Sequence, residues 1–437
     1  MTMNRMLSTI QIRQALRLWA LVCMALLAGC LSDSAREPST GAIRIGVLYP
    51  FSGPDAATGD DLKAGLDLAV EIINQSHEID LPLARGSGLP GQSGRRIELV
   101  FRNTESDPAV AARELKTLVS SGQGIVAMIG CYHSSVTALA SEQAEMQQIP
   151  FLNPDSTSPL LVQRGLKWFF RTTPDDEMFS RNFFEFLNDM RAKGLLPRSL
   201  PLALVYENGL WGTGVAQAQQ RLAWQQGYRI ALDVPYTVSA GSFQPELERI
   251  ASVMPGVILQ SSYTRDALEF VKGYRSAQVQ PIAILGMDSG FISPQFISTL
   301  GADAENVLSR EVWALDLSEK KPLVKVVNDL FRKRYQRDMT GNSARSFTGL
   351  IVLAEAINRA DGLTPQAVRA ALARTDIGAD QLIMPWDGIR FDPETGQNIL
   401  GKGIIVQVQQ GRYVTVWPDS LAVRAPVWTN VSSMKEK

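Results

Sequence analysis

The sequence predicts an α/β protein of two lobes, each built around a parallel β-sheet. Three observations support this fold class. Short apolar runs bounded by glycine or polar residues recur along the chain, and such runs are typical of strands buried on both faces. Helical patterns with one apolar face separate these runs, as in βαβ units. The alternation begins at Ile43 and begins again after Pro174, and 437 residues leave room for two domains of roughly 150 residues each.

Residues 1–30 have the pattern of an export signal. Three arginines precede an apolar stretch at residues 18–27, which is too short for a transmembrane helix. The stretch leads into Leu27-Ala28-Gly29-Cys30, which resembles the lipoprotein box of bacteria, where the peptide is cut before the cysteine. We therefore expect a lipid on Cys30, a tether over residues 31–42 and attachment to a membrane surface. The alternative is an ordinary signal peptide in which a cysteine occurs at this position by chance. The sequence does not indicate which membrane leaflet would hold the lipid.

Composition excludes several classes of function. The net charge of −1 and the hydrophobic content of 45% describe an ordinary globular protein, and no basic excess points to nucleic acid. Cys23 leaves with the signal and Cys30 is expected to carry lipid, so Cys131 has no partner for a disulfide. His77 and His133 are the two histidines, too few with Cys131 for a metal site. No nucleophile elbow or Walker loop is present, so we expect no cofactor and no enzyme.

The most informative stretch follows the strand Ile125–Ile129. Ser134 opens a helical pattern there, and a second apolar run, Ile149–Leu152, leads into the polar turn Asp155-Ser156-Thr157. Because parallel strands end at the same edge of a sheet, Ser134 and this turn should lie side by side where open α/β sheets bind small molecules. The N–H groups at a helix start also favour an anion. The stretch therefore predicts half of a pocket for a small polar molecule.

The first unit contains further elements in βα order. Ile43–Leu48 predicts a strand, and a helix with Leu62 and Leu66 on its apolar face follows. Residues 75–94 are rich in glycine, proline and polar residues and predict a loop insertion. A strand at 97–101 and a helix at 109–118 come next, which completes a doubly wound parallel sheet.

The second unit repeats the pattern. We expect helices at 178–190, 214–226 and 266–275, and strands at 202–206, 229–234, 256–260 and 281–285. Helical segments at 323–335 and 346–360 follow without an obvious new sheet. The tail predicts a hairpin that turns at Gln410-Gly411.

Several stretches resemble the leucine/isoleucine/valine-binding protein family, from residue 43 to about 418. They read IGVLYPFSGPDAATGDDLKAGLDLAVEIIN, MIGCYHSSVTALASEQAEMQQIPFLNPDSTSP, FFRTTPDDEMFSRNF, VYENGLWGTGVA, ILGMDSGFISPQF and FDPETGQN. The resemblance implies a type I periplasmic binding protein, with two Rossmann-like lobes joined by a three-segment hinge. It places the crossings near Thr172–Pro174, Glu311–Trp313 and Met384–Trp386.

The resemblance also implies domain boundaries, partners and a place in the cell. The first lobe comprises 43–173 and 312–385, the second lobe 174–311 and 386–425, and a tail 426–437. Members of the family deliver a solute to the permease of an ABC transporter in the bacterial periplasm or cell envelope. A lipid on Cys30 would hold this chain at the membrane.

The family's amino-acid pocket can be carried over to five positions. The resemblance places Ser134 and Thr157 at the ligand's α-carboxylate, and Asp288 at its α-ammonium. It places Tyr263 on the second lobe's side of the pocket and Trp211 as an aromatic wall, where the family has a tyrosine. Structural roles remain the alternative for each residue, such as a helix cap for Ser134.

Two departures from the family pattern concern the ligand's identity. Asp155 replaces a small apolar residue, and together with Asp288 it gives the pocket two acids, which demand a cation or the protonation of one acid. Thr58 replaces an aromatic residue. We therefore expect an amino acid or amino-acid-like solute and do not commit to leucine. An amide or urea receptor and a sensory subunit with the same fold are the alternatives.

Overall fold

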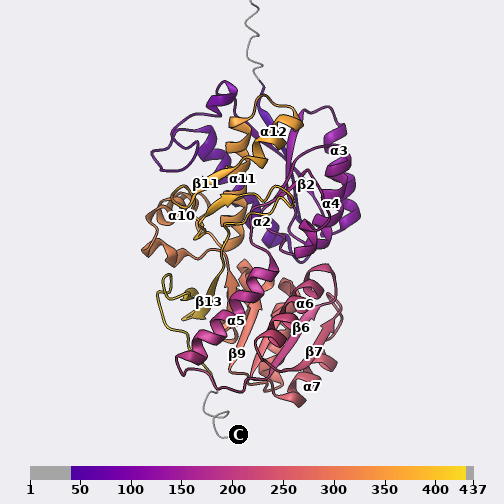
Figure 1. Ribbon diagram of the computed structural model, residues 1–437, viewed down its shortest axis with the longest axis vertical. Coiled ribbons are helices and arrows are strands. Elements are labelled where there is room, and N and C mark those ends of the chain that lie inside the picture. The colour runs from indigo at the N-terminus through magenta and orange to yellow at the C-terminus, as the bar shows by residue number, and fades with distance from the viewer. Residues whose placement is uncertain (1–40, 430–437) are drawn as a thin grey trace, which may run out of the picture. The chain divides into compact units, whose positions relative to one another are not determined.

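A computed structural model of the chain describes residues 41–429. The predicted signal peptide, Cys30, nearly all of the tether and residues 430–437 of the tail lie outside these residues. From Ala42 onward the chain forms one compact unit with two sheets of mainly parallel strands (Figure 1). We call the part around the five-stranded sheet the first lobe and the part around the seven-stranded sheet the second lobe. The predicted fold class, α/β in two lobes, is confirmed.

The sheet of the first lobe is entirely parallel. It runs in the order β2-β1-β3-β4-β5. The strands are β1 (Ile43–Tyr49), β2 (Ile97–Asn103), β3 (Ile125–Gly130), β4 (Phe151–Asn153) and β5 (Phe169–Arg171). The order reverses between β1 and β3, so the loops that leave these two strands part at the carboxyl edge, where such sheets bind small molecules.

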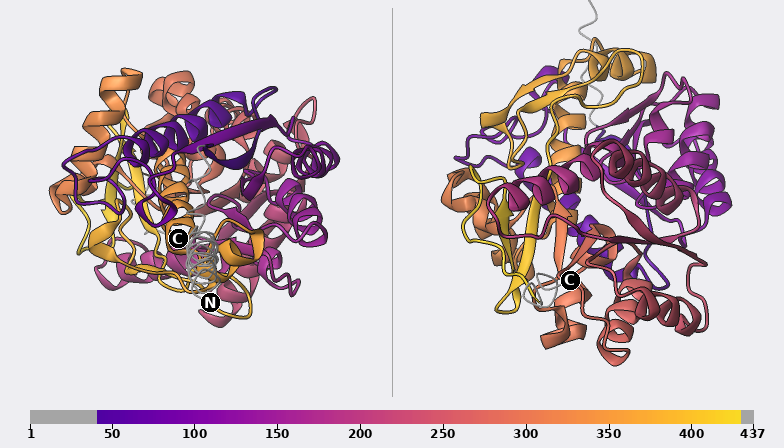
Figure 2. Two further views of the ribbon diagram at one scale, coloured as in Figure 1. Left: turned by 90° about the horizontal axis from the view of Figure 1, so that it is seen from above. Right: turned by 60° about the horizontal axis from the view of Figure 1, so that its bottom comes forward.

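Helices cover both faces of this sheet. Alternate side chains of a strand point to opposite faces, and Val47 of β1 lies in one core while Leu48 lies in another. The first core contains α2 and α11, and the second contains α3 and α4. The helices of this lobe are α2 (Ala56–Asn74), α3 (Pro108–Ser120), α4 (Ser134–Met146), α10 (Pro322–Tyr335), α11 (Gly341–Arg359) and α12 (Pro365–Ala373). Figure 2 shows the helices around the sheets from two further sides.

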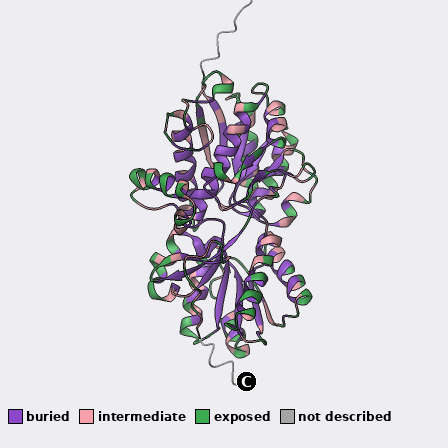
Figure 3. Cartoon of the chain, turned by 60° about the vertical axis from the view of Figure 1, so that its left-hand side comes forward, coloured by how far each residue is buried: buried purple, intermediate pink, exposed green. Residues whose placement is uncertain are grey.

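The second lobe adds an antiparallel edge to a parallel sheet. Its order is β14-β13-β10-β9-β8-β6-β7, and the β13–β14 hairpin turns at Gln410-Gly411 as expected. The strands are β6 (Leu202–Glu207), β7 (Ile230–Tyr236), β8 (Val257–Ser261), β9 (Ala283–Met287), β10 (Leu308–Glu311), β13 (Ile404–Gln409) and β14 (Arg412–Trp417). The helices are α5 (Asp176–Ala192), α6 (Leu210–Gln225), α7 (Gln244–Val253), α8 (Thr264–Ser276) and α9 (Pro294–Leu300). The strands of both sheets are largely buried (Figure 3).

Short elements connect these layers. They are the 3-10 turns η1 (Pro90–Gln92), η2 (Pro159–Val162), η3 (Ser289–Ile292), η4 (Gly301–Ala304), η5 (Leu315–Glu319) and η6 (Ala379–Gln381), and the strands β11 (Asp376–Gly378) and β12 (Gly388–Arg390). None of the helices within residues 41–429 is long and apolar enough to cross a membrane.

The third crossing between the lobes differs from the expected place. The chain leaves β5 for α5 and leaves β10 for η5, close to the first two expected crossings. After residue 385, however, β12 pairs with β11, so these residues stay with the preceding strand. The chain reaches the sheet of the second lobe only at β13. The crossing therefore lies between Arg390 and Ile404, later than Met384–Trp386, and the other domain boundaries stay predictions.

The helix α11 begins earlier than the sequence indicated. Thr340 caps it, with its side chain accepting from the backbone of Asn342 while the Ser343 hydroxyl reaches back to the cap. Every residue from 341 to 354 is buried. The expected helix starts at Ser346 and so lacks the first turn, which carries Arg345.

Candidate ligand-binding cleft

The seven residues expected to bind the ligand all line one small cavity between the lobes. The cavity is lined by Ser134, Asp155, Ser156, Thr157, Trp211, Tyr263 and Asp288, together with Tyr132, Ser289 and Arg345. The volume open to the centre of a water molecule is about 10 Å³, room for about one water. We call this space the deep cavity. The structure brings the seven residues together, while their role in binding stays a prediction.

The ends of parallel strands position these side chains. Ser134 is the first residue of α4, just after β3, and the Asp155-Ser156-Thr157 turn follows β4. In the second lobe, Tyr263 precedes α8 and Asp288 follows β9. Trp211 lies in the first turn of α6, which follows β6. The carboxyl edges of both sheets thus contribute residues to one cavity.

Ser156 holds the lining together. Its hydroxyl oxygen lies 3.1 Å from the carbonyl oxygen of Cys131 and 3.0 Å from that of Tyr132. It also lies 2.6 Å from the hydroxyl of Thr137. Because these contacts use the hydroxyl within the chain, Ser156 fixes the turn after β4 against the loop after β3.

The cation that the two acids demand is a side chain of the protein, Arg345. Its Nη1 donates to Oδ2 of Asp288 at 2.9 Å, and its Nε lies 3.9 Å from Oδ1 of Asp155. Arg310 Nη1 lies 3.0 Å from the same oxygen of Asp288. Both guanidinium groups are buried. Neither arginine was predicted from the sequence to belong to the site.

Burial controls the charges around these arginines. It raises the pKa of Asp155 to about 7, against the attraction of Arg345 and a 2.6 Å hydrogen bond from the Tyr49 hydroxyl. It also raises the pKa of Asp176 and of Glu311 to about 7. Burial opposes the charge on Arg345, but the surrounding acids outweigh it and hold its pKa above the usual range. The cluster therefore keeps its arginines charged and gains protons as the pH falls through neutrality.

Replacing Asp155 by asparagine should remove part of the pH dependence of the protein's stability. The folded pKa of about 7 lies above the usual 3.8, so the folded state binds more protons between these values and stability falls as the pH rises through that window. Asparagine keeps the shape and an acceptor for Tyr49 and does not titrate. We expect the free energy of unfolding of the variant, measured in urea, to gain on that of the wild type by roughly 2 kcal/mol between pH 5 and pH 7 and to change little above that range. Equal pH profiles of the two proteins would contradict the raised pKa.

Contacts between polar and aromatic side chains join the lobes beside the deep cavity. One is the Arg345–Asp288 ion pair. The hydroxyls of Tyr132 and Ser289 lie 2.8 Å apart. The rings of His133 and Tyr263 lie 4.7 Å apart between centroids. The wall of the cleft is therefore made by both lobes.

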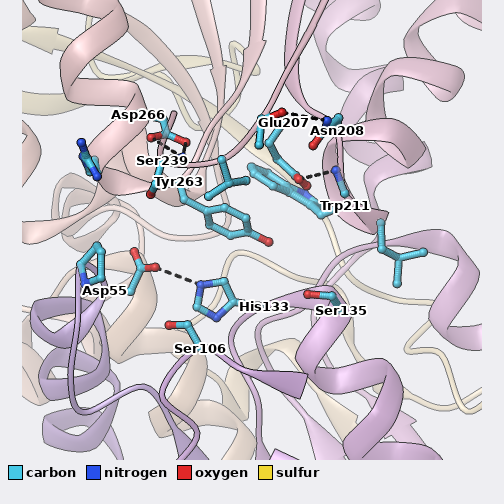
Figure 4. Close-up of a pocket in the computed structure, with 16 residues that line it drawn as sticks. Asp55, Ser106, His133, Ser135, Glu207, Asn208, Trp211, Ser239, Tyr263 and Asp266 are labelled. Atoms are coloured by element: carbon cyan, nitrogen blue, oxygen red, sulfur yellow. Dashed lines mark hydrogen bonds and ion pairs between the residues drawn. The ribbon is translucent and has the colours of Figure 1, made fainter. Parts of the chain in front are cut away.

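A larger space lies beyond the aromatic rings. Trp211 and Tyr263 line both this space and the deep cavity. The space has about 390 Å³ open to the centres of water molecules, and we call it the outer chamber. Asp55, His133, Trp211 and Tyr263 face one another across it (Figure 4). The outer chamber is large enough for a small solute, and Trp211 and Tyr263 lie between it and the deep cavity.

Comparisons with known proteins identify the family. The model of the family described as periplasmic binding protein matches residues 42–412. The chain is 29% identical over 414 residues to Leu/Ile/Val-binding protein homolog 7 of Brucella suis biovar 1 (strain 1330), covering 92% of this chain and 97% of that protein.

Two solved structures share the fold. A leucine-binding protein of Thermotoga maritima has a TM-score of 0.73 at 19% identity, covering 87% of this chain and all of that one. An ABC transporter substrate-binding protein of Desulfitobacterium hafniense, in complex with Leu, has a TM-score of 0.68 at 22% identity, covering 86% of this chain and 99% of that one. With the family model matching most of its length, the chain belongs to the periplasmic binding protein family, whose members are solute-binding, non-catalytic proteins.

Proposed function

We propose that the chain captures an amino acid or amino-acid-like solute between its lobes and passes it to the permease of an ABC importer. The observation that carries this proposal is the convergence of Ser134, Thr157, Trp211, Tyr263 and Asp288 on one cleft at the carboxyl edges of both sheets. The names of the Brucella relative and of the leucine complex support an amino acid. The proposal includes no catalytic step.

The start of α4 suits the carboxylate of such a solute. Ser134 opens the helix, and its cap residue, His133, makes no hydrogen bond from its side chain to the first turn. The N–H groups of that turn and the Ser134 hydroxyl are therefore placed for an anion. The rings of Trp211 and Tyr263, 4.9 Å apart between centroids, would cover the apolar part of the solute.

The expected location follows from the same assignment. A lipid on Cys30 would hold the chain at a membrane of the cell envelope, with the lobes in the periplasm and the permease as its partner. No cofactor is required, since closure around a solute needs only the two lobes.

A thermal-shift screen tests the proposal. Bound solute is first removed by unfolding and refolding, and the protein is then melted with each amino acid, with polyamines, and with amides and urea. A solute at a hundredfold excess over its Kd stabilises the folded state by ~2.7 kcal/mol. We expect a rise in melting temperature with at least one amino acid. A rise with amides alone would favour the amide receptor, which the engagement of Asp288 by two arginines supports. No rise with any of these solutes would contradict the proposal.

A further inference from the structure

Asp288 is already engaged by the protein. Its Oδ2 lies 2.9 Å from Nη1 of Arg345 and 3.0 Å from Nη1 of Arg310. An ammonium on this carboxylate would be a third cation around one acid, and it would lie beside Arg345, which lines the same deep cavity. The deep cavity therefore offers a poor place for the amine of a solute.

The outer chamber has more acidic than basic side chains in its lining. Three acids line it: Asp55, Glu207 and Asp266. Among the described residues that line it, Arg265 is the one arginine or lysine, and its Nε binds Glu269 at 3.0 Å. A small cation thus meets an excess of negative charge in the outer chamber.

Of these three acids, Asp55 is the one with a carboxylate oxygen that has no hydrogen-bond partner in the described part of the chain. Glu207 accepts backbone N–H groups of Gly209 and Gly212 at 2.6 Å each, and Asp266 accepts from the backbone of Ser239. Asp55 binds Nε2 of His133 through Oδ2 at 3.0 Å.

Two atoms of this pair lack partners. Oδ1 of Asp55 and Nδ1 of His133 have no hydrogen-bond partner within the described part of the chain, although both side chains are only 8% exposed. Buried polar atoms of this kind are stabilised by a bound donor or acceptor. The pair lines the outer chamber, so a solute held there can supply that group.

The surroundings of the pair suit an ammonium group. The ring of Tyr263 lies 4.7 Å from His133 and 4.9 Å from Trp211 between centroids (Figure 4). Aromatic faces attract a cation held near a carboxylate. Ser135, in the first turn of α4, lines the same chamber. An ammonium at Asp55 and a carboxylate at the start of α4 would thus be adjacent, as they are in an α-amino acid.

We propose that Asp55, oriented by His133, binds the ammonium group of the solute in the outer chamber, in place of Asp288. This inference rests on the proposed function and assigns the solute to the class of primary amines with a neighbouring carboxylate. Arg345 and Arg310 then offset the charges of Asp155 and Asp288 inside the cleft, with no ammonium group competing for these acids.

Binding of paired ligands, one with and one without the amine, to the full chain tests this assignment. Isothermal titration compares each amino acid with the carboxylic acid that lacks its amine, for example L-leucine with 4-methylpentanoate. The proteins are the wild type, Asp55→Asn, and Asp60→Asn as a matched control, since Asp60 is an exposed acid on the same helix. Asparagine keeps the shape of Asp55 and is itself a favoured cap residue. His133→Gln serves as a second variant if Asp55→Asn fails to fold.

We expect the wild type and Asp60→Asn to prefer an amino acid over its deaminated analogue by roughly tenfold to hundredfold, the usual strength of a hydrogen bond to a charged group. Asp55→Asn should lose this preference and keep its affinity for the analogue. His133→Gln should weaken the preference in the same way. A preference that survives in Asp55→Asn, or equal binding of both ligands by the wild type, would overturn the assignment and leave the proposed function standing. No binding of any amino acid or analogue to the wild type would overturn both.

Discussion

Replacing Arg345 by methionine is expected to lower the free energy of unfolding by about 3–5 kcal/mol at pH 8, the usual cost of removing one partner from a buried ion pair. Methionine keeps much of the apolar stem but leaves Asp155 without its nearest cation and Asp288 with Arg310 alone. Urea unfolding measures the change. The exposed Arg113, paired with its neighbour Glu114 on the surface, provides the control, and Arg113→Met should change the stability by less than about 0.5 kcal/mol.

The cost of Arg345→Met should depend on pH. Without the guanidinium, the pKa of Asp155 rises further above about 7, because the hydrogen bond from Tyr49 is then left to oppose burial without Arg345. Protonation relieves the unpaired charge, so the variant should recover part of its stability between pH 8 and pH 5. A variant as stable as the wild type at pH 8 would contradict the role of Arg345 as the cation of the cleft.

Replacing Gly65 by alanine is expected to lower the free energy of unfolding by about 3 kcal/mol. A Cβ at this position of α2 would lie 2.2 Å from the backbone oxygen of Ser343 and 2.3 Å from the hydroxyl of Ser346, both on α11. A backbone oxygen inside a buried helix moves only if the helix moves, so α11 must shift away from α2. Arg345 lies between these two residues on α11, so the shift would also disturb its ion pairs.

The control for this variant is Gly241→Ala. A Cβ there meets nothing within 4 Å, so we expect the stability to stay within about 0.5 kcal/mol of the wild type. Urea unfolding gives the free energy of unfolding of both variants. The solute affinity of the folded proteins, measured below their melting temperatures, shows whether the shift of α11 also disturbs the cleft around Arg345. Equal stability of Gly65→Ala and Gly241→Ala would show that α2 and α11 pack less closely than described.

Much of the first lobe could be predicted because its signals are local. The run Ile125–Ile129 and the serine at 134 mark a strand and a helix start within ten residues, and the structure places β3 and α4 there. The hairpin at Gln410-Gly411 has an equally local signal. The convergence of Ser134, Tyr263 and Asp288 came from the family resemblance, since their spacing in the chain carries no information about distance.

The arginines could not be predicted for the same reason. Arg345 lies 57 residues from Asp288 and 190 from Asp155, and only the fold brings the three together. The turn that contains it, residues 341–345, has no apolar periodicity, because α11 is buried on every side there and its small polar residues pack without an exposed face. The two acids indicated that a cation was needed but not which residue supplied it.

The third crossing was misplaced because its signals are weak. β11 and β12 are three residues each, too short for an alternating pattern, and their antiparallel pairing, with Ile377 opposite Ile389, is made only in the folded chain.

A crystal structure with the solute that stabilises the protein most would test the central claim directly. We predict a solute between the lobes, with its carboxylate about 3 Å from the N–H groups at the start of α4, its amine beside Asp55, and Trp211 and Tyr263 over its apolar part. A solute bound outside the cleft would contradict the account of this protein as a receptor that closes on an amino acid.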